Sequence, residues 1–250
     1  MNICVFDTET TALEKPFCYN IGYAIIDTET ATILTAKDRV AEQVWHNPML
    51  FTTAYYADKR EIYVERMRAR QTKMDKFGFI CQEMIRDFEA YGVSMAFAFN
   101  SDFDERVFKY NCEWFKCNNP FDNIEIKDIR GFAHEFIVDK EYKAFCDEFG
   151  YYTESGNYST TAEIMYRYIV DNEFVEEHTA LADSLAEWAI LKECVERGAE
   201  LTDNYKARQS IAKTEPKEFT VKKNGEVIFK TEFTGGARYY KNSNAIYLRD

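Results

Sequence analysis

Residues 3–10 read Ile-Cys-Val-Phe-Asp-Thr-Glu-Thr, four apolar residues followed by carboxylates that alternate with hydroxyls. A short apolar run that ends in turn chemistry predicts a strand buried on both faces. Residues two apart on a strand point to the same face, so we expect Asp7 and Glu9 to project together from the carboxyl end of this strand. Ligands of open α/β sheets usually bind at that edge.

Strand and helix patterns alternate along the following residues. Further strands are predicted at Tyr19–Ile26, Ile33–Val40, Met95–Phe99 and Ile124–Ile129. Helices are predicted at Lys73–Tyr91, at Glu105–Phe115 and over most of the remainder as far as Gly198. Strands that come first and then alternate with helices predict an α/β fold, with a mixed sheet covered by helices on both faces.

The chain changes in pattern and charge after residue 198. Residues 199–218 are polar and predict a linker or an exposed helix, after a main domain over residues 1–198. Residues 219–250 alternate around Asn224-Gly225, a strong hairpin signal, and predict a small β appendage. Residues 204–250 carry a net charge of +5 and the rest of the chain −17, so only the tail is biased towards a polyanion.

The composition of the 250 residues excludes several classes of protein. Hydrophobic residues make up 46% and charged residues 30%, which is typical of a folded globular chain. The net charge of −12 argues against a protein that coats nucleic acid electrostatically, but not against an enzyme that bridges carboxylates to phosphates through metal ions. The start lacks signal-peptide features and no apolar run approaches the ~20 residues of a membrane span, so a cytoplasmic protein is expected.

The seven cysteines are odd in number and include no Cys-x-x-Cys pair. Cys112 and Cys117 are closest in the sequence, and no histidine lies nearby to complete a zinc site. We therefore expect buried free thiols in a reducing compartment.

Two clusters of carboxylates follow predicted strands. Asp7 and Glu9 would repel each other unless a cation lies between them, and hard ions such as Mg²⁺ or Mn²⁺ prefer carboxylate oxygens. The alternative is a solvated pair at a turn. The second cluster, Asn-Ser-Asp-Phe-Asp at residues 100–104, also suits helix capping, and its spacing alone does not choose between Asp102 and Asp104.

A third cluster occupies residues 176–183, Glu-Glu-His-Thr-Ala-Leu-Ala-Asp. Asp183 is expected to begin a helix whose apolar stripe faces the core, so a carboxylate near that stripe is conspicuous. His178 is one of three histidines in the chain. An isolated histidine is usually a surface residue or a hydrogen-bonded core residue, so His178 alone is a weak signal.

Together and in this order, the three clusters resemble the motifs of the DEDDh 3'→5' exonucleases of the RNase H-like superfamily. The family's aspartate-x-glutamate at the end of the first strand matches residues 7–9. Its asparagine followed by phenylalanine-aspartate matches residues 100–104, which selects Asp104 over Asp102. Its histidine five residues before an aspartate matches residues 178–183. The likeness covers about residues 1–197.

The resemblance implies a metal-dependent exonuclease that releases nucleoside 5'-monophosphates from the 3' end of nucleic acid, with single-stranded DNA favoured. The implied ligands of two divalent cations, Mg²⁺ or Mn²⁺, are Asp7, Glu9, Asp104 and Asp183. His178 is implied as the general base. The remaining residues of the motifs are expected to contact the substrate, namely Thr8, Thr10, Asn100 and Phe103. The family's frequent glycine after the first motif is Ala12 here, and the histidine before the asparagine is Phe99.

Two alternatives stay open. The enzyme could act on RNA or short oligoribonucleotides, because the contacts that recognise a 2'-OH cannot be located from the sequence. The chain could also be a non-catalytic module that binds nucleic acid or recruits a partner through the basic appendage. Residues 44–74 are not obviously an element of the family, and the appendage lies outside the likeness.

Overall fold

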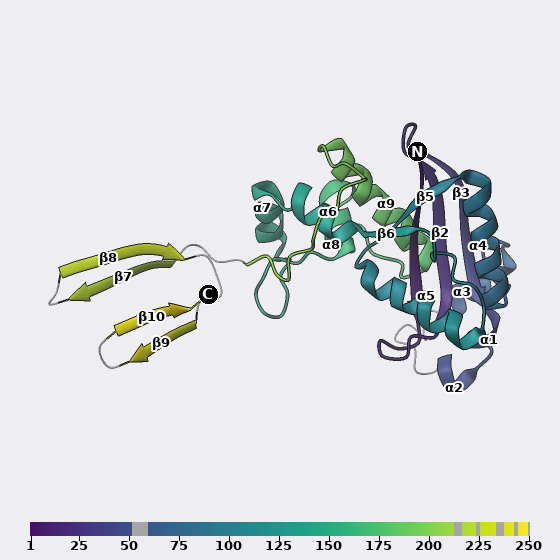
Figure 1. Ribbon diagram of the computed structural model, residues 1–250, viewed down its shortest axis with the longest axis horizontal. Helices are drawn as coiled ribbons and strands as arrows, with labels where there is room; N and C mark the ends of the chain where they lie inside the picture. The colour runs from purple at the N-terminus through teal and green to yellow at the C-terminus, as the bar shows by residue number, and fades with distance from the viewer. Residues whose placement is uncertain (52–59, 213–216, 224–225, 234–237, 243–244, 250) are drawn as a thin grey trace. The chain divides into compact units, whose positions relative to one another are not determined.

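The computed structural model describes residues 1–51, 60–212, 217–223, 226–233, 238–242 and 245–249. The chain divides into two compact units, residues 1–142 with 160–208 and residues 143–159 with 209–250. The first unit contains the six-stranded sheet and all of the candidate site residues (Figure 1).

The sheet is mixed, as the sequence predicts. Its order is β4-β3-β2-β1-β5-β6, and its strands are β1 (Asn2–Thr10), β2 (Cys18–Asp27), β3 (Thr32–Ala41), β4 (Lys73–Asp75), β5 (Val93–Ala98) and β6 (Glu125–Asp128). The first three strands pair antiparallel, whereas β4 pairs in parallel with β3, β5 with β1, and β6 with β5. β1 is therefore an interior strand, which explains its apolar first half.

Helices cover both faces of this sheet (Figure 1). The helices of the described residues are α1 (Glu42–Trp45), α2 (Pro48–Phe51), α3 (Arg60–Arg68), α4 (Phe77–Tyr91), α5 (Ser101–Phe115), α6 (Ile129–Phe136), α7 (Lys140–Phe149), most of which belongs to the second unit, α8 (Ala162–Ile169) and α9 (Ala180–Glu196). Alternate strand residues such as Cys4, Phe6 and Tyr23 form the main core with α4 and α5. α9 packs across β1 and β2, and none of the helices within the described residues is long and apolar enough to cross a membrane.

Three predicted helices begin elsewhere, and one of them, α5, begins at Ser101 rather than Glu105. The prediction of a helix from Lys73 is wrong at its start, because Lys73–Asp75 form β4 and α4 begins at Phe77. The Phe77 N–H donates to Gln43 Oε1 at 2.9 Å, and pairing with β3 outweighs the local helical pattern of residues 73–76. α9 begins at Ala180 rather than Asp183, so Asp183 lies within its first turn.

Residues 199–208 pack against the first unit instead of forming a helix. The Lys127 side chain is buried, and its Nζ donates to the carbonyl oxygens of Thr202 and Asp203. A Cβ on Gly131 would lie 2.0 Å from the carbonyl oxygen of Tyr205, so the glycine lets this segment approach α6. This part of the predicted linker is therefore held by the domain that precedes it.

The second unit contains the hairpins that the sequence predicts near its C-terminus. β7 (Lys217–Lys223) pairs with β8 (Glu226–Phe233), and β9 (Arg238–Asn242) pairs with β10 (Ala245–Arg249), as two separate sheets. The turns between the paired strands, including Asn224-Gly225, lie outside the described residues.

Candidate active site

The chain brings Asp7 and Glu9 to the α9 face of the sheet. In β1 they lie opposite Gly22 and Asn20 of β2, and directly opposite residues in a strand pair share a face. A Cβ built on Gly22 would point into the first turn of α9, so the side chain of Asp7 is on that side as well. Glu9 is buried, and the Tyr19 hydroxyl donates to its Oε2 at 3.4 Å.

α9 begins directly on the sheet because residue 22 is a glycine. A Cβ there would lie 2.0 Å from the Leu181 backbone nitrogen and 2.1 Å from the Ala180 carbonyl carbon. Asn20 Oδ1 accepts the Ala180 N–H at 2.8 Å, which satisfies one of the free donors in the first helical turn. These two contacts place Asp183, three residues into α9, beside the carboxyl end of β1.

Helix α3, which lies within the segment that the sequence left unassigned (residues 44–74), supports this start of α9. The Tyr63 hydroxyl of α3 donates to Asn20 Oδ1 at 3.0 Å, and Asn20 Nδ2 donates to Asp38. Arg66, also in α3, forms ion pairs with Asp38 at 3.5 Å and with Glu177 at 2.6 Å. α3 therefore fixes the residue immediately before His178.

His178 lies with two of the predicted metal ligands. A ring nitrogen of His178 and carboxylate oxygens of Glu9 and Asp183 all lie within 4.8 Å of one another. The His178 backbone is left-handed, with φ of 54°, which costs a residue with a Cβ about 1–2 kcal/mol. Glu176 Oε2 lies 3.6 Å from His178 Nδ1, so this carboxylate can also orient the ring.

Asp104 reaches the same place from α5. Asn100 precedes this helix in a left-handed conformation, and its N–H donates to Asp128 Oδ1 at 2.8 Å. The Thr8 hydroxyl donates to Asp104 Oδ1 at 2.6 Å, and Asp104 is buried. Asp102, the alternative in this motif, is exposed. Thr8 and Asn100, predicted to contact substrate, are placed here as supports of the cluster.

The carboxylates destabilise one another's charged forms. Withdrawal from water raises the pKa of Asp7 well above its usual range, and the charges of Asp104, Glu187, Asp183 and Glu9 raise it further. Burial raises the pKa of Asp104 to about 7, although the Thr8 hydroxyl bond opposes this. Carboxyl groups that hold one another in the protonated form fit a site for a hard divalent cation, because the positive charge would favour their ionised form.

Sequence reasoning missed Glu187, a fifth carboxylate in this cluster. Glu187 lies one turn after Asp183 on α9, is 4% exposed, and accepts the Phe99 backbone N–H at 3.2 Å. It thereby links α9 to the end of β5, next to the Asn100 turn. Residues four apart share one face of a helix, and the packing of α9 on the sheet buries the face that carries Asp183 and Glu187.

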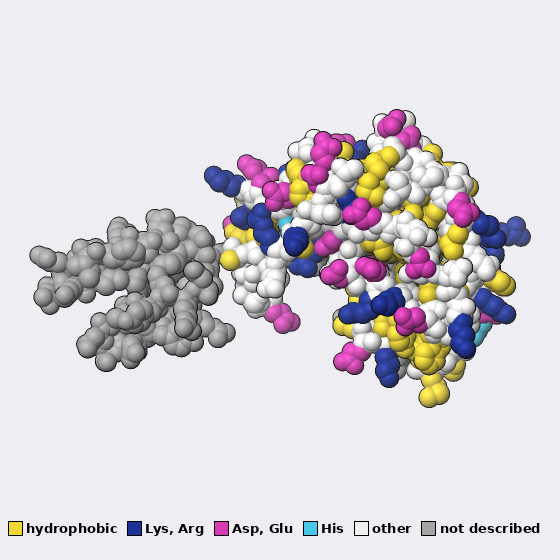
Figure 2. All heavy atoms as spheres, in the orientation of Figure 1, with side chains coloured by type: hydrophobic (Ala, Val, Ile, Leu, Met, Phe, Trp, Pro, Cys, Tyr) yellow, Lys and Arg dark blue, Asp and Glu magenta, His cyan; other side chains and the backbone are white. Residues whose placement is uncertain are grey.

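A pocket of 330 Å³ opens beside Glu9. It is lined by Thr8, Glu9, Thr10, Thr11, Ala12, Leu13 and Phe103. Leu13 is 74% exposed, and the Arg106 guanidinium lies 5.3 Å from the centre of the Phe103 ring. Of the predicted substrate contacts, Thr8, Thr10 and Phe103 thus line a shared hollow next to Glu9. On the face that Figure 2 shows, acidic and basic side chains are interspersed over the described surface.

Solved structures of nucleases share this architecture. The chain is similar to the nuclease domain of 3'hExo, a DEDDh family member, bound to rAMP, with a TM-score of 0.51 and 13% identity over 84% of this chain and 97% of that one. It is similar to a 3'-exonuclease in 3'-end specific recognition of histone mRNA stem-loop, with a TM-score of 0.55 and 14% identity over 86% and 72%.

E. coli Exonuclease I in complex with a dT13 oligonucleotide gives a TM-score of 0.53 and 15% identity over 78% of this chain, which spans 41% of that exonuclease. No protein-family model matches the sequence, and no curated protein matches it. The structural likeness, together with the order of the strands and the place of the carboxylates, shows that the chain has the fold of the DEDDh 3'-exonucleases.

Proposed function

We propose that this protein is a metal-dependent 3'→5' exonuclease that releases nucleoside 5'-monophosphates, with single-stranded DNA as the favoured substrate. The observation that supports this most strongly is the convergence of acidic side chains from β1, α5 and α9 with His178 at one sheet edge. The fold of the DEDDh 3'-exonucleases and the three sequence motifs independently favour the same chemistry.

Asp7, Glu9, Asp104 and Asp183 are the proposed ligands of two divalent ions, Mg²⁺ or Mn²⁺. Their carboxylate oxygens are the donors that such ions prefer, and the raised pKa values of Asp7 and Asp104 favour a site completed by positive charge. Bound in pairs, these ions activate water and stabilise the charge that develops during phosphodiester cleavage.

His178 is the proposed general base. Its ring nitrogen is within 4.8 Å of the carboxylate oxygens of Glu9 and Asp183, where it can take a proton from a water held by the cluster. Glu176 stabilises the protonated ring that results, from 3.6 Å away. General bases of this kind contribute about 10²–10⁴-fold in rate.

The pocket beside Glu9 is the proposed place of the 3'-terminal nucleotide. Leu13 and Phe103 offer apolar and aromatic surface on which a base can stack, and stacking is tolerant of base identity. Arg106 supplies a positive charge over the Phe103 ring, close to where a phosphate would enter. The net charge of +5 in residues 204–250 supports a further contact with nucleic acid or a protein partner.

A timed digestion of 5'-labelled single-stranded DNA, duplex DNA and RNA tests the proposal, each with Mg²⁺, Mn²⁺ or a chelator. We expect a metal-dependent ladder that shortens from the 3' end, fastest on single-stranded DNA. Faster cleavage of RNA would mean that RNA is the favoured substrate, while the proposed reaction would stand. Absence of cleavage with both metals would refute the nuclease and favour a binding module. Asp7→Asn, which keeps the shape of the side chain, is the matched inactive control.

A further inference from the structure

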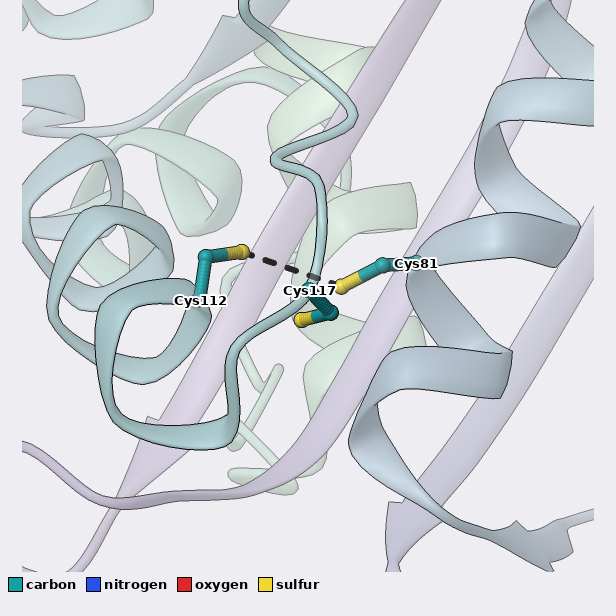
Figure 3. A group of neighbouring side chains, drawn as sticks. All are labelled: Cys81, Cys112 and Cys117. Carbon is teal, nitrogen blue, oxygen red and sulfur yellow. Dashed lines mark hydrogen bonds between the residues drawn. The ribbon is translucent and has the colours of Figure 1, made fainter.

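Three cysteine thiols meet on the opposite side of the sheet from α9. Cys81 lies in α4, Cys112 lies near the end of α5, and Cys117 follows α5 (Figure 3). The three sulfur atoms lie within 4.8 Å of one another, and Cys81 Sγ is 4.0 Å from Cys112 Sγ. The sequence indicated only the pair of Cys112 and Cys117, because Cys81 is 31 residues away from Cys112 in the chain.

The backbone after α5 turns back in order to place Cys117. Lys116 adopts a left-handed conformation with φ of 54°, and the Cys117 N–H donates to the Cys112 carbonyl oxygen at 3.1 Å. This position normally favours glycine, and a side chain there costs about 1–2 kcal/mol. The turn folds Cys117 over the end of its own helix, beside Cys112.

A glycine in α4 makes room for the same residue. Gly78 lies three residues before Cys81, on the same face of the helix, and a Cβ there would lie 3.2 Å from the Cys117 Cβ. Gly78 is the second residue of α4, and the missing Cβ leaves space for the Cys117 side chain. The glycine at residue 78 and the left-handed backbone at Lys116 thus bring the third thiol to the other two.

The spacing of the sulfurs fits a bound metal. Zinc–sulfur bonds are about 2.3 Å long, so thiolates at two corners of a tetrahedron lie about 3.8 Å apart, close to the 4.0 Å between Cys81 and Cys112. Cys117 is partly exposed, whereas the other two are buried. A pocket of about 560 Å³ is lined in part by Cys112, Cys117, Glu113 and Asp122, so two of the three cysteines border a hollow through which an ion can enter.

We propose that Cys81, Cys112 and Cys117 bind one thiophilic cation of the Zn²⁺ class through their sulfurs, with the fourth position open to the adjoining pocket. Soft thiolates select such an ion over the Mg²⁺ or Mn²⁺ that suits the carboxylates near Asp7. Coordination requires the thiols to lose their protons, which pass to solvent. The ion would fasten the end of α5 to α4 and so stiffen the helix that carries Asp104.

Cobalt titration of the full-length, reduced and chelator-treated protein tests this site, with excess Mg²⁺ present to occupy the carboxylates. We expect thiolate-to-cobalt charge-transfer absorption that saturates at one Co²⁺ per chain and is lost when Zn²⁺ displaces it. Carboxylates give no such band, so the signal reports sulfur ligation alone. Cys117→Ser should lower the affinity for Zn²⁺ at least about tenfold, measured by competition with a chromophoric chelator.

The matched control is Cys194→Ser, since Cys194 is a buried cysteine of α9 outside the cluster. It should bind Zn²⁺ as the wild type does, with circular dichroism confirming that both variants fold. Absence of the band in the wild type, or a Cys117→Ser protein with unchanged affinity, would overturn the proposal and leave three packed thiols. The readout is metal binding, so neither result depends on the proposed nuclease activity.

Discussion

Replacing Gly22 with alanine tests how α9 positions the candidate site. The added Cβ would lie 2.0 Å from the Leu181 nitrogen, where ordinary contact begins at 3.4 Å, so the start of α9 must move by about 1.4 Å. Gly22 is not among the glycines with positive φ, so its backbone conformation suits alanine and the cost comes from this collision. Asp183 and His178 flank the collision and must move with it.

The size of the effect follows from that displacement. Overpacking of this kind typically lowers the free energy of unfolding by about 1–3 kcal/mol. A misplacement of about 1 Å at a catalytic site costs roughly 10²-fold in rate, so we expect kcat/KM to fall by at least 10²-fold, or about 2.7 kcal/mol of transition-state stabilisation. The loss of activity should therefore exceed what the fraction of unfolded protein explains.

Urea unfolding and initial cleavage rates on a labelled oligonucleotide measure the two effects. Gly92→Ala is the matched control, because Gly92 has φ of +62° and a Cβ there meets nothing within 4 Å. It should lose about 1–2 kcal/mol of stability and keep its activity. A folded Gly22→Ala protein with wild-type kcat/KM would refute the reasoning that α9 positions the site through this contact.

Three further predictions concern the ionisable groups. His178→Ala should lower kcat by about 10²–10⁴-fold and leave the Mg²⁺ affinity unchanged, because the proposed role of the ring is to accept a proton and not to bind the ion. Cleavage rates over a Mg²⁺ titration measure both quantities. Folding raises the pKa of Asp104 from 3.8 to about 7, so the metal-free folded state binds this proton more tightly than the unfolded state does. The Tm measured in chelator should therefore fall as the pH rises from about 4 to 7. Mg²⁺ should raise Tm more at pH 8 than at pH 5, because fewer protons compete with the ion at pH 8. Glu187→Gln should stabilise the metal-free protein at pH 8, because the amide oxygen still accepts the Phe99 N–H but has no negative charge. Glu187→Ala leaves that N–H without its acceptor and should lower the free energy of unfolding in urea by about 1–3 kcal/mol.

Each of these has a contrary result. Full recovery of the His178→Ala rate at high Mg²⁺ would mean that the ring binds metal. A metal-free Tm that rises between pH 4 and 7 would contradict the crowded, protonated cluster around Asp104. Equal stability of the glutamine and alanine variants at Glu187 would show that its bond to Phe99 is not needed.

Local patterns predicted the parts of the fold that depend on near neighbours. β1 is an apolar run because it lies inside the sheet, and α4 ends at Gly92 because that glycine accepts a left-handed turn. The start of α4 was missed, since Lys73–Asp75 become a strand only when β3 lies beside them. Pairing between distant segments leaves no periodic signal in a short window.

The candidate site also contains residues that local motifs predict and residues that only distant contacts bring into place. Asp7, Asp104 and His178 were predicted from the resemblance of short stretches of the chain to family motifs, so no knowledge of distant contacts was needed to propose them. Glu187 was missed because a single carboxylate on a helix normally faces solvent, and only the packing of α9 on the sheet buries it. The role of Arg66 was missed because its partners, such as Glu177, are far away in the chain.

The most direct test of the account is to identify the products that wild-type protein and Asp7→Asn release from a 5'-labelled oligonucleotide with Mg²⁺. Mass spectrometry should find nucleoside 5'-monophosphates and chains shortened one residue at a time from the 3' end with wild type, and neither with Asp7→Asn or with chelator. Products of the same kind and amount from folded Asp7→Asn, or none from the wild type, would contradict the central claim that these carboxylates form a nuclease site.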